Sequence, residues 1–307
     1  MQYTIDEHFV SRFIINRFSD SQEQVGFINI KQKQPVLRTT KSTAICFRKN
    51  MYERKNVDGS YFERNSTEKR YAAIEAELSS KLEPMIVKLH LGGILSAEDN
   101  AYLTVLFALQ LVRTPMLKRV VFKKDGSKQN VARQLEQNSI YKMMIDSVDV
   151  GIQYLLQNGF AISDEVIRQI RNTANHQKSM VDEVMQYIQR NCSFYFITTQ
   201  GHPFLLSDNP VLIDKFENTK YIFPIDPRHA IICAVRETDK NMDWGCLNRI
   251  PDDTVDKINL FSIQNADNLI VCHPDNQTYY LTLLQRRIHQ KDDQNRKGDV
   301  QWIQEIR

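Results

Sequence analysis

Residues 70–82 read RYAAIEAELSSKL and have the pattern of a long amphipathic helix. Its apolar residues recur every three or four positions, which places them on one face of an α-helix. NAYLTVLFALQLV, residues 100–112, has the pattern of a second and more apolar helix. Two polar pairs precede these stretches and resemble capping boxes: Asn65 with Glu68, and Ser96 with Asp99. The centre of the chain is therefore predicted to be helical.

Helical patterns continue through the centre of the chain. Apolar residues recur with helical spacing over about 132–158 and 163–190, so we expect a helical centre at 66–190 with four sizeable helices. Before this centre, TIDEHFVSRFIINRF has the apolar spacing of a first helix. Two β-like segments follow it, VGFINI and TAICFR.

The chain becomes β-rich after Asn191. Four short apolar segments alternate with turn-forming residues: SFYFITT, PFLLSD, KYIFPID and HAIICAV. A helix at about 252–260, a strand at LIVCH and a helix through YYLTLLQRRI are expected to follow. The sequence thus predicts an α+β fold with a central helical bundle, short N-terminal strands and a β-rich C-terminal half. We expect one intertwined domain at 1–290, including a β-rich part at 191–290, and a polar tail at 291–307.

Composition favours a globular protein and argues against a membrane-spanning, secreted or zinc-binding one. With 42% hydrophobic and 25% charged residues, the chain can form a core. The longest apolar run, residues 102–112, is too short to cross a bilayer, and the first residues lack the pattern of a secretory signal. We therefore expect a cytoplasmic protein without membrane contact. The five cysteines lack zinc-site spacing and are expected to be free, structural thiols.

Positive charge is unevenly distributed along the chain. Residues 31–70 contain eleven lysine and arginine residues against four aspartate and glutamate residues, and residues 113–133 contain seven against one. Such surpluses can bind phosphates, or they can form an ordinary solvated basic surface. Where they lie in the folded protein distinguishes the two interpretations.

Several stretches, in order, resemble a largely uncharacterised bacterial family, domain of unknown function 4238. HFVSRFIINRF is similar to its N-terminal pattern of histidine, Val-Pro, an aromatic residue and a final phenylalanine, with Ser11 where the family usually has proline. Residues 49–78 are similar to its tyrosine-then-glutamate segment. Four later landmarks follow in the family's order: LVRTP, LLSDNPV, FPIDP and NLFSIQNADNLIV. The resemblance spans about residues 8–271 and implies no established activity.

The resemblance singles out five polar positions as candidate site residues: His8, Glu68, Glu75, Arg113 and Asp208. Helical spacing places Glu68 and Glu75 at the edge of an apolar stripe, where a carboxylate needs a partner. Arg113 ends the apolar helix that follows and is a natural partner. One interpretation is a buried ion pair between Arg113 and a glutamate of this stripe, which orients two helices. The other is a polar pocket in which His8, Glu75, Arg113 and Asp208 converge on a ligand or metal.

A metal-dependent nuclease is an alternative interpretation of the same residues. Glu68, Glu75 and Asp208 could supply oxygen ligands to Mg²⁺. No lysine stands at the short spacing typical of a restriction-type nuclease core. Asp208 lies in SDNPV, after an apolar strand, and could instead cap a turn through its own backbone.

The stretch RNTANH, residues 171–176, contains the pattern Arg-Asn-x-x-x-His. It resembles the motif of HEPN (higher eukaryote and prokaryote nucleotide-binding) ribonucleases, which carry it on a helix of a small bundle and usually dimerise. Arg171, Asn172 and His176 match the arginine, polar and histidine positions. The resemblance implies metal-free RNA cleavage, in which the arginine binds the phosphate, the histidine transfers a proton and the asparagine orients either group. A solvated helix surface is the alternative.

These observations lead to one leading hypothesis and two alternatives. The leading hypothesis is an intracellular bacterial nuclease that cleaves RNA without a metal ion or cofactor, in antiphage defence or as a toxin. RNA or another nucleic acid would be its substrate, and a second copy of the chain or a defence-system protein would be its partner. The alternatives are the metal-dependent nuclease and a non-catalytic sensor or partner-binding protein.

Overall fold

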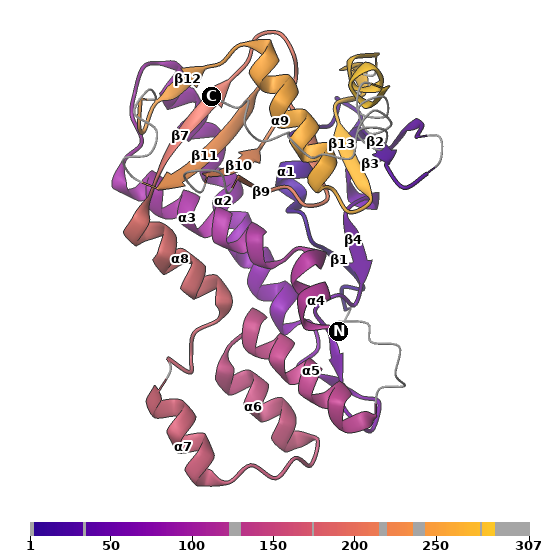
Figure 1. The fold of residues 1–307 in the computed structure, drawn as a ribbon, viewed down its shortest axis with the longest axis vertical. Helices are drawn as coiled ribbons and strands as arrows, with labels where there is room; N and C mark the ends of the chain where they lie inside the picture. Colours follow the sequence, from indigo (N-terminus) through magenta and orange to yellow (C-terminus); the bar gives the residue numbers. More distant parts are fainter. Residues whose placement is uncertain are drawn as a thin grey trace, which may run out of the picture. The chain divides into compact units, whose positions relative to one another are not determined.

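The computed structural model has the α+β fold that the sequence predicts (Figure 1). The structure describes residues 3–32, 35–122, 130–173, 175–214, 220–235, 243–276 and 278–285. The predicted tail at 291–307 lies outside this range. Two compact units are present: a helical unit, Met1–Phe9 with Phe47–Lys81 and Ala101–Arg190, and a sheet unit, Val10–Cys46 with Leu82–Asn100 and Asn191–Arg307. The single intertwined domain at 1–290 stays a prediction.

The helical unit combines two short antiparallel strand pairs with the predicted helical centre. β1 (Asp6–His8) pairs with β4 (Phe47–Lys49), and β5 (Arg54–Lys55) pairs with β6 (Tyr61–Phe62). The helices are α2 (Ser66–His90), α3 (Ala97–Val112), α4 (Pro115–Val121), α5 (Val131–Ile145), α6 (Val148–Gln157), α7 (Asp164–Thr173) and α8 (Met180–Asn191). The C-terminal part of α2, from Leu82, and the first turn of α3, up to Asn100, belong to the sheet unit.

The predicted helix at 163–190 is wrong, because the chain forms two helices there. α7 ends at Thr173 and α8 begins at Met180. Ser179 starts α8 with a capping box: its Oγ accepts from Asp182 N–H at 3.4 Å, and Asp182 Oδ2 accepts from Ser179 N–H at 2.7 Å. The segment at 132–158 is divided in the same way, because Ser147 Oγ caps α6 by accepting from Val150 N–H at 3.3 Å. Each division coincides with a serine cap.

The two predicted capping boxes have different outcomes. Ser96 and Asp99 form one, with Asp99 N–H donating to Ser96 Oγ at 3.1 Å and Ser96 N–H donating to Asp99 Oδ2 at 2.7 Å. The Asn65 box is wrong. Asn65 has a positive φ of 62°, and its side chain hydrogen bonds to both backbone groups of Thr4. The Asn65 side chain therefore binds the N-terminal segment at Thr4 and does not cap α2.

The predicted N-terminal helix through residues 4–18 is also wrong in extent. Residues 6–8 form β1, and only α1 (Arg12–Asn16) is helical. Glu7 explains part of the difference, because its carboxyl oxygen Oε2 accepts a hydrogen bond from Tyr52 N–H at 2.7 Å while its backbone pairs with β4. Long-range pairing therefore overrides the local helical pattern.

α5 and α6 lie side by side and pack closely (Figure 1). Gly151 permits this approach, since a Cβ there would lie 2.8 Å from the Ser139 carbonyl oxygen and 2.2 Å from Met143 Cγ. Ser139 Oγ donates to the Gly151 carbonyl at 2.8 Å. This contact fixes the first turns of α6, where a candidate site residue lies.

The described residues of the sheet unit form two sheets. The five-stranded sheet has the order β12-β7-β11-β10-β9 and the four-stranded sheet the order β3-β2-β13-β8; all pairs are antiparallel except β12 with β7. The strands are β2 (Gln24–Asn29), β3 (Leu37–Lys41), β7 (Cys192–Thr198), β8 (Leu206–Ser207), β9 (Leu212–Asp214), β10 (Lys220–Pro224), β11 (His229–Val235), β12 (Leu247–Arg249) and β13 (Leu269–Cys272). The short helices are α1, η1 (Ser42–Ala44) and η2 (Pro274–Asn276).

Helix α9 (Asp252–Asn265) joins the cores of the two sheets. Val255 and Ile258 pack with residues of the five-stranded sheet, whereas Ile263 packs with the four-stranded sheet and with Tyr280 of the helical residues 278–285. The β-rich character that the sequence predicts after Asn191 is confirmed. The five cysteines are free thiols, as predicted.

Candidate functional site

Arg171 and His176 meet on one carboxylate, that of Asp149 in the first turn of α6. Arg171 Nε donates to Asp149 Oδ1 at 3.1 Å, and His176 Nδ1 lies 2.5 Å from Asp149 Oδ2. The backbone strengthens this link, because Asp149 N–H donates to the His176 carbonyl at 3.0 Å. We call these three residues the Asp149 site. Asp149 is absent from the sequence-based predictions.

Local structure explains how the three side chains come together. Arg171 lies in the last turn of α7, whereas His176 lies in the turn that separates α7 from α8. The separation of the helices brings His176 back to the start of α6, which a continuous helix could not do. Lys178 N–H donates to the Asn175 carbonyl at 2.9 Å and closes this turn. Asn172 is exposed on α7, and no described residue forms a hydrogen bond with its side chain.

The charge of Asp149 sets the hydrogen positions in the site. Partial desolvation opposes ionisation of this carboxyl, but the hydrogen bonds from His176 and Arg171 outweigh it and lower its pKa. An ionised carboxylate can only accept, so His176 Nδ1 carries the hydrogen of their contact. In the neutral ring, Nε2 is then an acceptor with a free lone pair.

The site is open to solvent. The side chains of Arg171, His176 and Asp149 are 49%, 26% and 22% exposed. Within the described part of the chain, Asp149 is the one ion-pair partner of Arg171, which leaves the terminal nitrogens of the guanidinium available to an anion. The site therefore offers a cation for a phosphate and a proton acceptor beside it.

Arg113, one of the five polar positions that the family resemblance singles out, is almost fully buried, at 2% exposure, and forms an ion pair with Glu75. Its guanidinium also donates to the His8 carbonyl, and its Nε donates to Tyr52 Oη at 3.3 Å. The His8 contact is therefore made by the backbone. An Arg113–glutamate ion pair is what the helix-orienting interpretation predicts. Binding of a ligand or metal by His8, Glu75, Arg113 and Asp208 stays a prediction.

Two further carboxylates in this interior were not predicted. Glu7 is fully buried, and Glu53 is 7% exposed. Burial is the largest cause that raises the pKa of Glu7 to about 8, and the neighbouring Glu53 raises it further. Burial also raises the pKa of Glu68. Glu7 is therefore mostly protonated at neutral pH, which reduces repulsion among the buried carboxylates.

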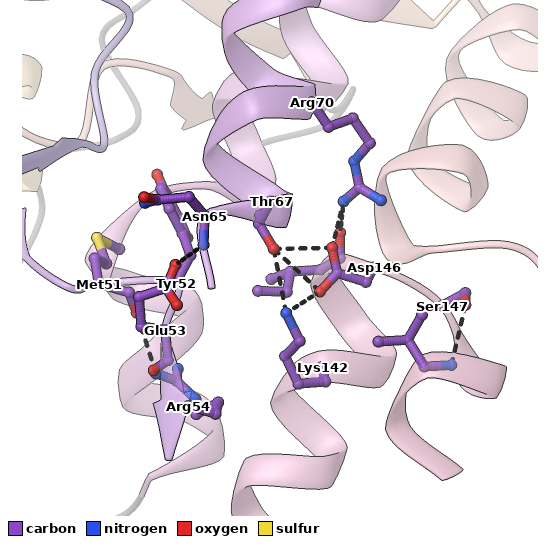
Figure 2. A network of polar contacts seen from close by, with 12 residues as sticks. Met51, Tyr52, Glu53, Arg54, Asn65, Thr67, Arg70, Lys142, Asp146 and Ser147 are labelled. Carbon is purple, nitrogen blue, oxygen red and sulfur yellow. Dashed lines mark hydrogen bonds and ion pairs between the residues drawn. The ribbon is translucent and has the colours of Figure 1, made fainter. Parts of the chain in front are cut away.

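Asp146, which is also buried, is the acidic centre of a polar network beside α2 (Figure 2). It pairs with the buried Lys142 and with Arg70 Nη2 at 2.8 Å, and it accepts from Thr67 Oγ1 at 2.9 Å. Figure 2 shows these side chains converging between α2 and α5. The network joins the two helices, and none of its members was predicted as a site residue.

Asp208 is the one predicted site residue that lies in the sheet unit. Its carboxylate accepts from the backbone N–H groups of Asp267 at 2.7 Å, Asn268 at 2.8 Å and Leu269 at 3.1 Å. Asp208 therefore organises the turn before β13. Among the described residues, no group of three or more histidine, cysteine, aspartate or glutamate side chains is arranged to hold a metal ion.

Several arginines of the two basic stretches, residues 31–70 and 113–133, are buried or paired with acidic side chains. Arg54 and Arg113 are buried, at 5% and 2% exposure, and Arg70 pairs with Asp146. These side chains balance internal carboxylates or stack on aromatic rings, as Arg54 does on Tyr141. Residues 123–129 of the second surplus lie outside the described residues.

Comparison with known proteins identifies the family. A model of the family described as Protein of unknown function (DUF4238) matches residues 7–276, so the chain belongs to this family. No curated protein and no solved structure matches the chain. Over the residues that the structure describes, every helix is too short or too polar to cross a membrane.

Proposed function

We propose that this protein is a metal-independent endoribonuclease and that the Asp149 site is its active site. The observation that carries the proposal is the shared carboxylate. Asp149 holds a guanidinium and an imidazole side by side and fixes the imidazole so that Nε2 is the free nitrogen. Metal-free cleavage of RNA needs groups of these two kinds, because the phosphate must be neutralised while a proton moves.

The proposed reaction uses the neighbouring hydroxyl of the RNA as nucleophile. Terminal nitrogens of Arg171 bind the scissile phosphate. His176 Nε2 accepts the proton of the 2′-hydroxyl as O2′ attacks phosphorus, and the P–O5′ bond breaks. The proton is then delivered to the leaving 5′-oxygen. The products are a 2′,3′-cyclic phosphate and a 5′-hydroxyl, so atoms and charge balance without a metal ion.

Asp149 acts as the positioning residue in this mechanism. It stabilises the imidazolium that forms when His176 accepts the proton, and it prevents Arg171 from moving away from the imidazole. Asn172 is exposed next to Arg171 and could contact the same phosphate. A second copy of the chain would supply a second histidine, allowing one to act as base and the other as acid. The resemblance to HEPN ribonucleases favours such a dimer and a role in antiphage defence or as a toxin.

The class of reaction is tested with two oligonucleotides of one sequence, one RNA and one all-deoxy. The full chain is expected to cleave the RNA in excess EDTA and to leave the deoxy oligonucleotide intact, because the deoxy strand lacks the nucleophile. Product ends are identified by mass spectrometry. Cleavage that stops in EDTA would favour the metal-dependent nuclease instead. No cleavage of RNA, or cleavage of both strands, would contradict the proposal.

A further inference from the structure

An arginine at the surface of the helical unit packs on two tyrosine rings. The guanidinium carbon of Arg64 lies 4.1 Å from the centroid of the Tyr3 ring and 4.5 Å from that of the Tyr61 ring. Lys55 Nζ lies 5.3 Å from the Tyr61 centroid, and Lys55 is the cross-strand partner of Tyr61 in the β5–β6 pair. We call these four residues the tyrosine platform. The proposed ribonuclease reaction uses none of them.

The backbone around Arg64 holds the platform in place. Its two neighbours, Glu63 and Asn65, have left-handed φ angles of 46° and 62°, which residues other than glycine rarely adopt. Asn65 is buried, and its side chain hydrogen bonds to both backbone groups of Thr4, which places Tyr3 beside Arg64. The guanidinium is therefore fixed in position before any ligand binds, which reduces the entropy lost on binding.

The two cations of the platform have no acidic partner in the part of the chain that the structure describes. No described carboxylate forms an ion pair with Arg64 or Lys55, and Arg64 Nε is buried without a hydrogen-bond partner. Asp58, in the turn between the two strands, instead accepts hydrogen bonds from Ser60 N–H at 2.9 Å and Ser60 Oγ at 2.7 Å. The platform thus presents two positive charges that are available to an anion.

Cations beside exposed aromatic rings are the groups with which proteins bind a nucleic-acid strand. The cations attract phosphates, and an aromatic ring stacks on a base of any kind. Tyr3 is 42% exposed, and Arg64 is the one described residue that stacks on its ring, so a base can reach the ring from solvent. A base can stack on a side chain only when it is not held inside a double helix. The chemistry of the platform therefore favours a single strand.

Helix α6 joins the platform to the Asp149 site. The turn of the β5–β6 hairpin binds the residue that follows α6: Val57 N–H donates to Asn158 Oδ1 at 2.7 Å, and Asn158 Nδ2 donates to Asn56 Oδ1 at 2.9 Å. Asp149 lies in the first turn of the same helix, which is 10 residues long, so its two ends are about 15 Å apart. Stacked nucleotides advance about 3.4 Å each, so roughly five of them span this distance.

We propose that the tyrosine platform binds single-stranded RNA, with phosphates on Arg64 and Lys55 and a base stacked on Tyr3. The choice of RNA rests on the proposed ribonuclease function, whereas the preference for a single strand follows from the platform itself. The platform reads the backbone and the face of a base, so it binds strands of different sequence with similar affinity.

Binding is measured apart from cleavage with a short fluorescent RNA whose riboses are 2′-O-methylated. The methyl groups remove the nucleophile of the proposed reaction, so the strand stays intact in the presence of the full chain. Fluorescence anisotropy should show saturable binding of the single strand. The same strand annealed to its complement should bind at least ~10-fold more weakly, because its bases cannot stack on Tyr3.

Two variants separate the charge of the platform from its stacking. Arg64→Gln removes one phosphate contact, so it should weaken binding and reduce the slope of log Kd against log salt concentration by about 0.7. Tyr3→Leu removes the ring, so it should weaken binding about 5- to 100-fold and leave that slope unchanged. Arg190→Gln and Tyr187→Leu are the matched controls, because both residues are exposed on α8, and both variants should bind like the wild type.

Three results would overturn the proposal: no saturable binding by the wild type, equal affinity for the single strand and the duplex, or wild-type affinity in a folded Arg64→Gln or Tyr3→Leu variant. Thermal unfolding shows whether each variant is folded, and Tyr3→Leu alone decides if Arg64→Gln is not. A chain that cleaves RNA but whose variants bind normally retains its ribonuclease function and loses the platform. A chain whose variants lose binding but which cleaves no RNA retains the platform and loses the ribonuclease function.

Discussion

Replacement of His176 by alanine is expected to lower the rate of RNA cleavage by about 10²–10⁴-fold, the usual contribution of a positioned acid or base. The fold should be unaffected, because the side chain is partly exposed and lies in a turn between helices. The rate is measured under single-turnover conditions with a defined RNA in excess EDTA. Circular dichroism and thermal unfolding of the same preparations confirm that both proteins are folded.

The matched control for this variant is His202→Ala. His202 also places Nδ1 on a carboxylate, that of Asp256, at 2.7 Å, and its side chain is 41% exposed. It has the same hydrogen-bonding arrangement but belongs to the sheet unit. We expect His202→Ala to cleave RNA at the wild-type rate. If both variants lose activity equally, or if neither does, His176 has no special role in cleavage.

The second large effect concerns Glu7 and the dependence of stability on pH. Its pKa is about 8 in the folded protein, against 4.5 for an ordinary glutamate. Between these values the folded protein keeps a proton that the unfolded chain has lost, so the free energy of unfolding decreases as pH rises through this window. The loss from this group is on the order of 5 kcal/mol once the pH exceeds about 8.

Glu7→Gln should remove most of this pH dependence. Glutamine has the same shape, stays neutral, and can accept the hydrogen bond that Tyr52 N–H makes with Glu7. Urea unfolding of the wild type and the variant at pH 5, 7 and 9 should therefore give similar stabilities at pH 5 and a more stable variant at pH 9. Glu136→Gln, on the exposed side of α5, should parallel the wild type throughout. Parallel pH profiles for Glu7→Gln and the wild type would show that Glu7 is ionised in the folded protein at neutral pH.

Local patterns predicted much of the fold. The apolar spacing in residues 70–82 and 100–112 and the Ser96 cap predict α2 and α3 correctly. The Ser179 cap was equally visible in the sequence as a serine followed three residues later by an acid, and it would have divided the helix predicted at 163–190. The strand β1 and the left-handed Asn65 depend on contacts with distant residues, which local spacing does not contain.

The candidate site could be predicted only in part. Sequence pattern selects Arg171 and His176, but Asp149 is 27 residues from His176 and joins it through the course of the intervening chain. The ion pair of Arg113 with Glu75 follows from amphipathic spacing, because each residue borders an apolar stripe and needs a partner. Glu7 lies in a segment whose apolar spacing predicts a helix but which forms β1, and Glu53 lies in a short segment without clear periodicity, so the local pattern marks neither as buried.

RNA cleavage by Asp149→Asn in excess EDTA shows whether Asp149 positions Arg171 and His176 for catalysis. Asparagine preserves the size of the side chain but removes the charge that holds Arg171 and His176 together. We expect the rate at saturating RNA to fall at least ~100-fold while thermal unfolding changes little, because Asp149 lies at the surface. Asp149→Glu, which restores a carboxylate, should recover part of the rate. Cleavage by Asp149→Asn at the wild-type rate would contradict the account, since Asp149 would then have no part in positioning the imidazole.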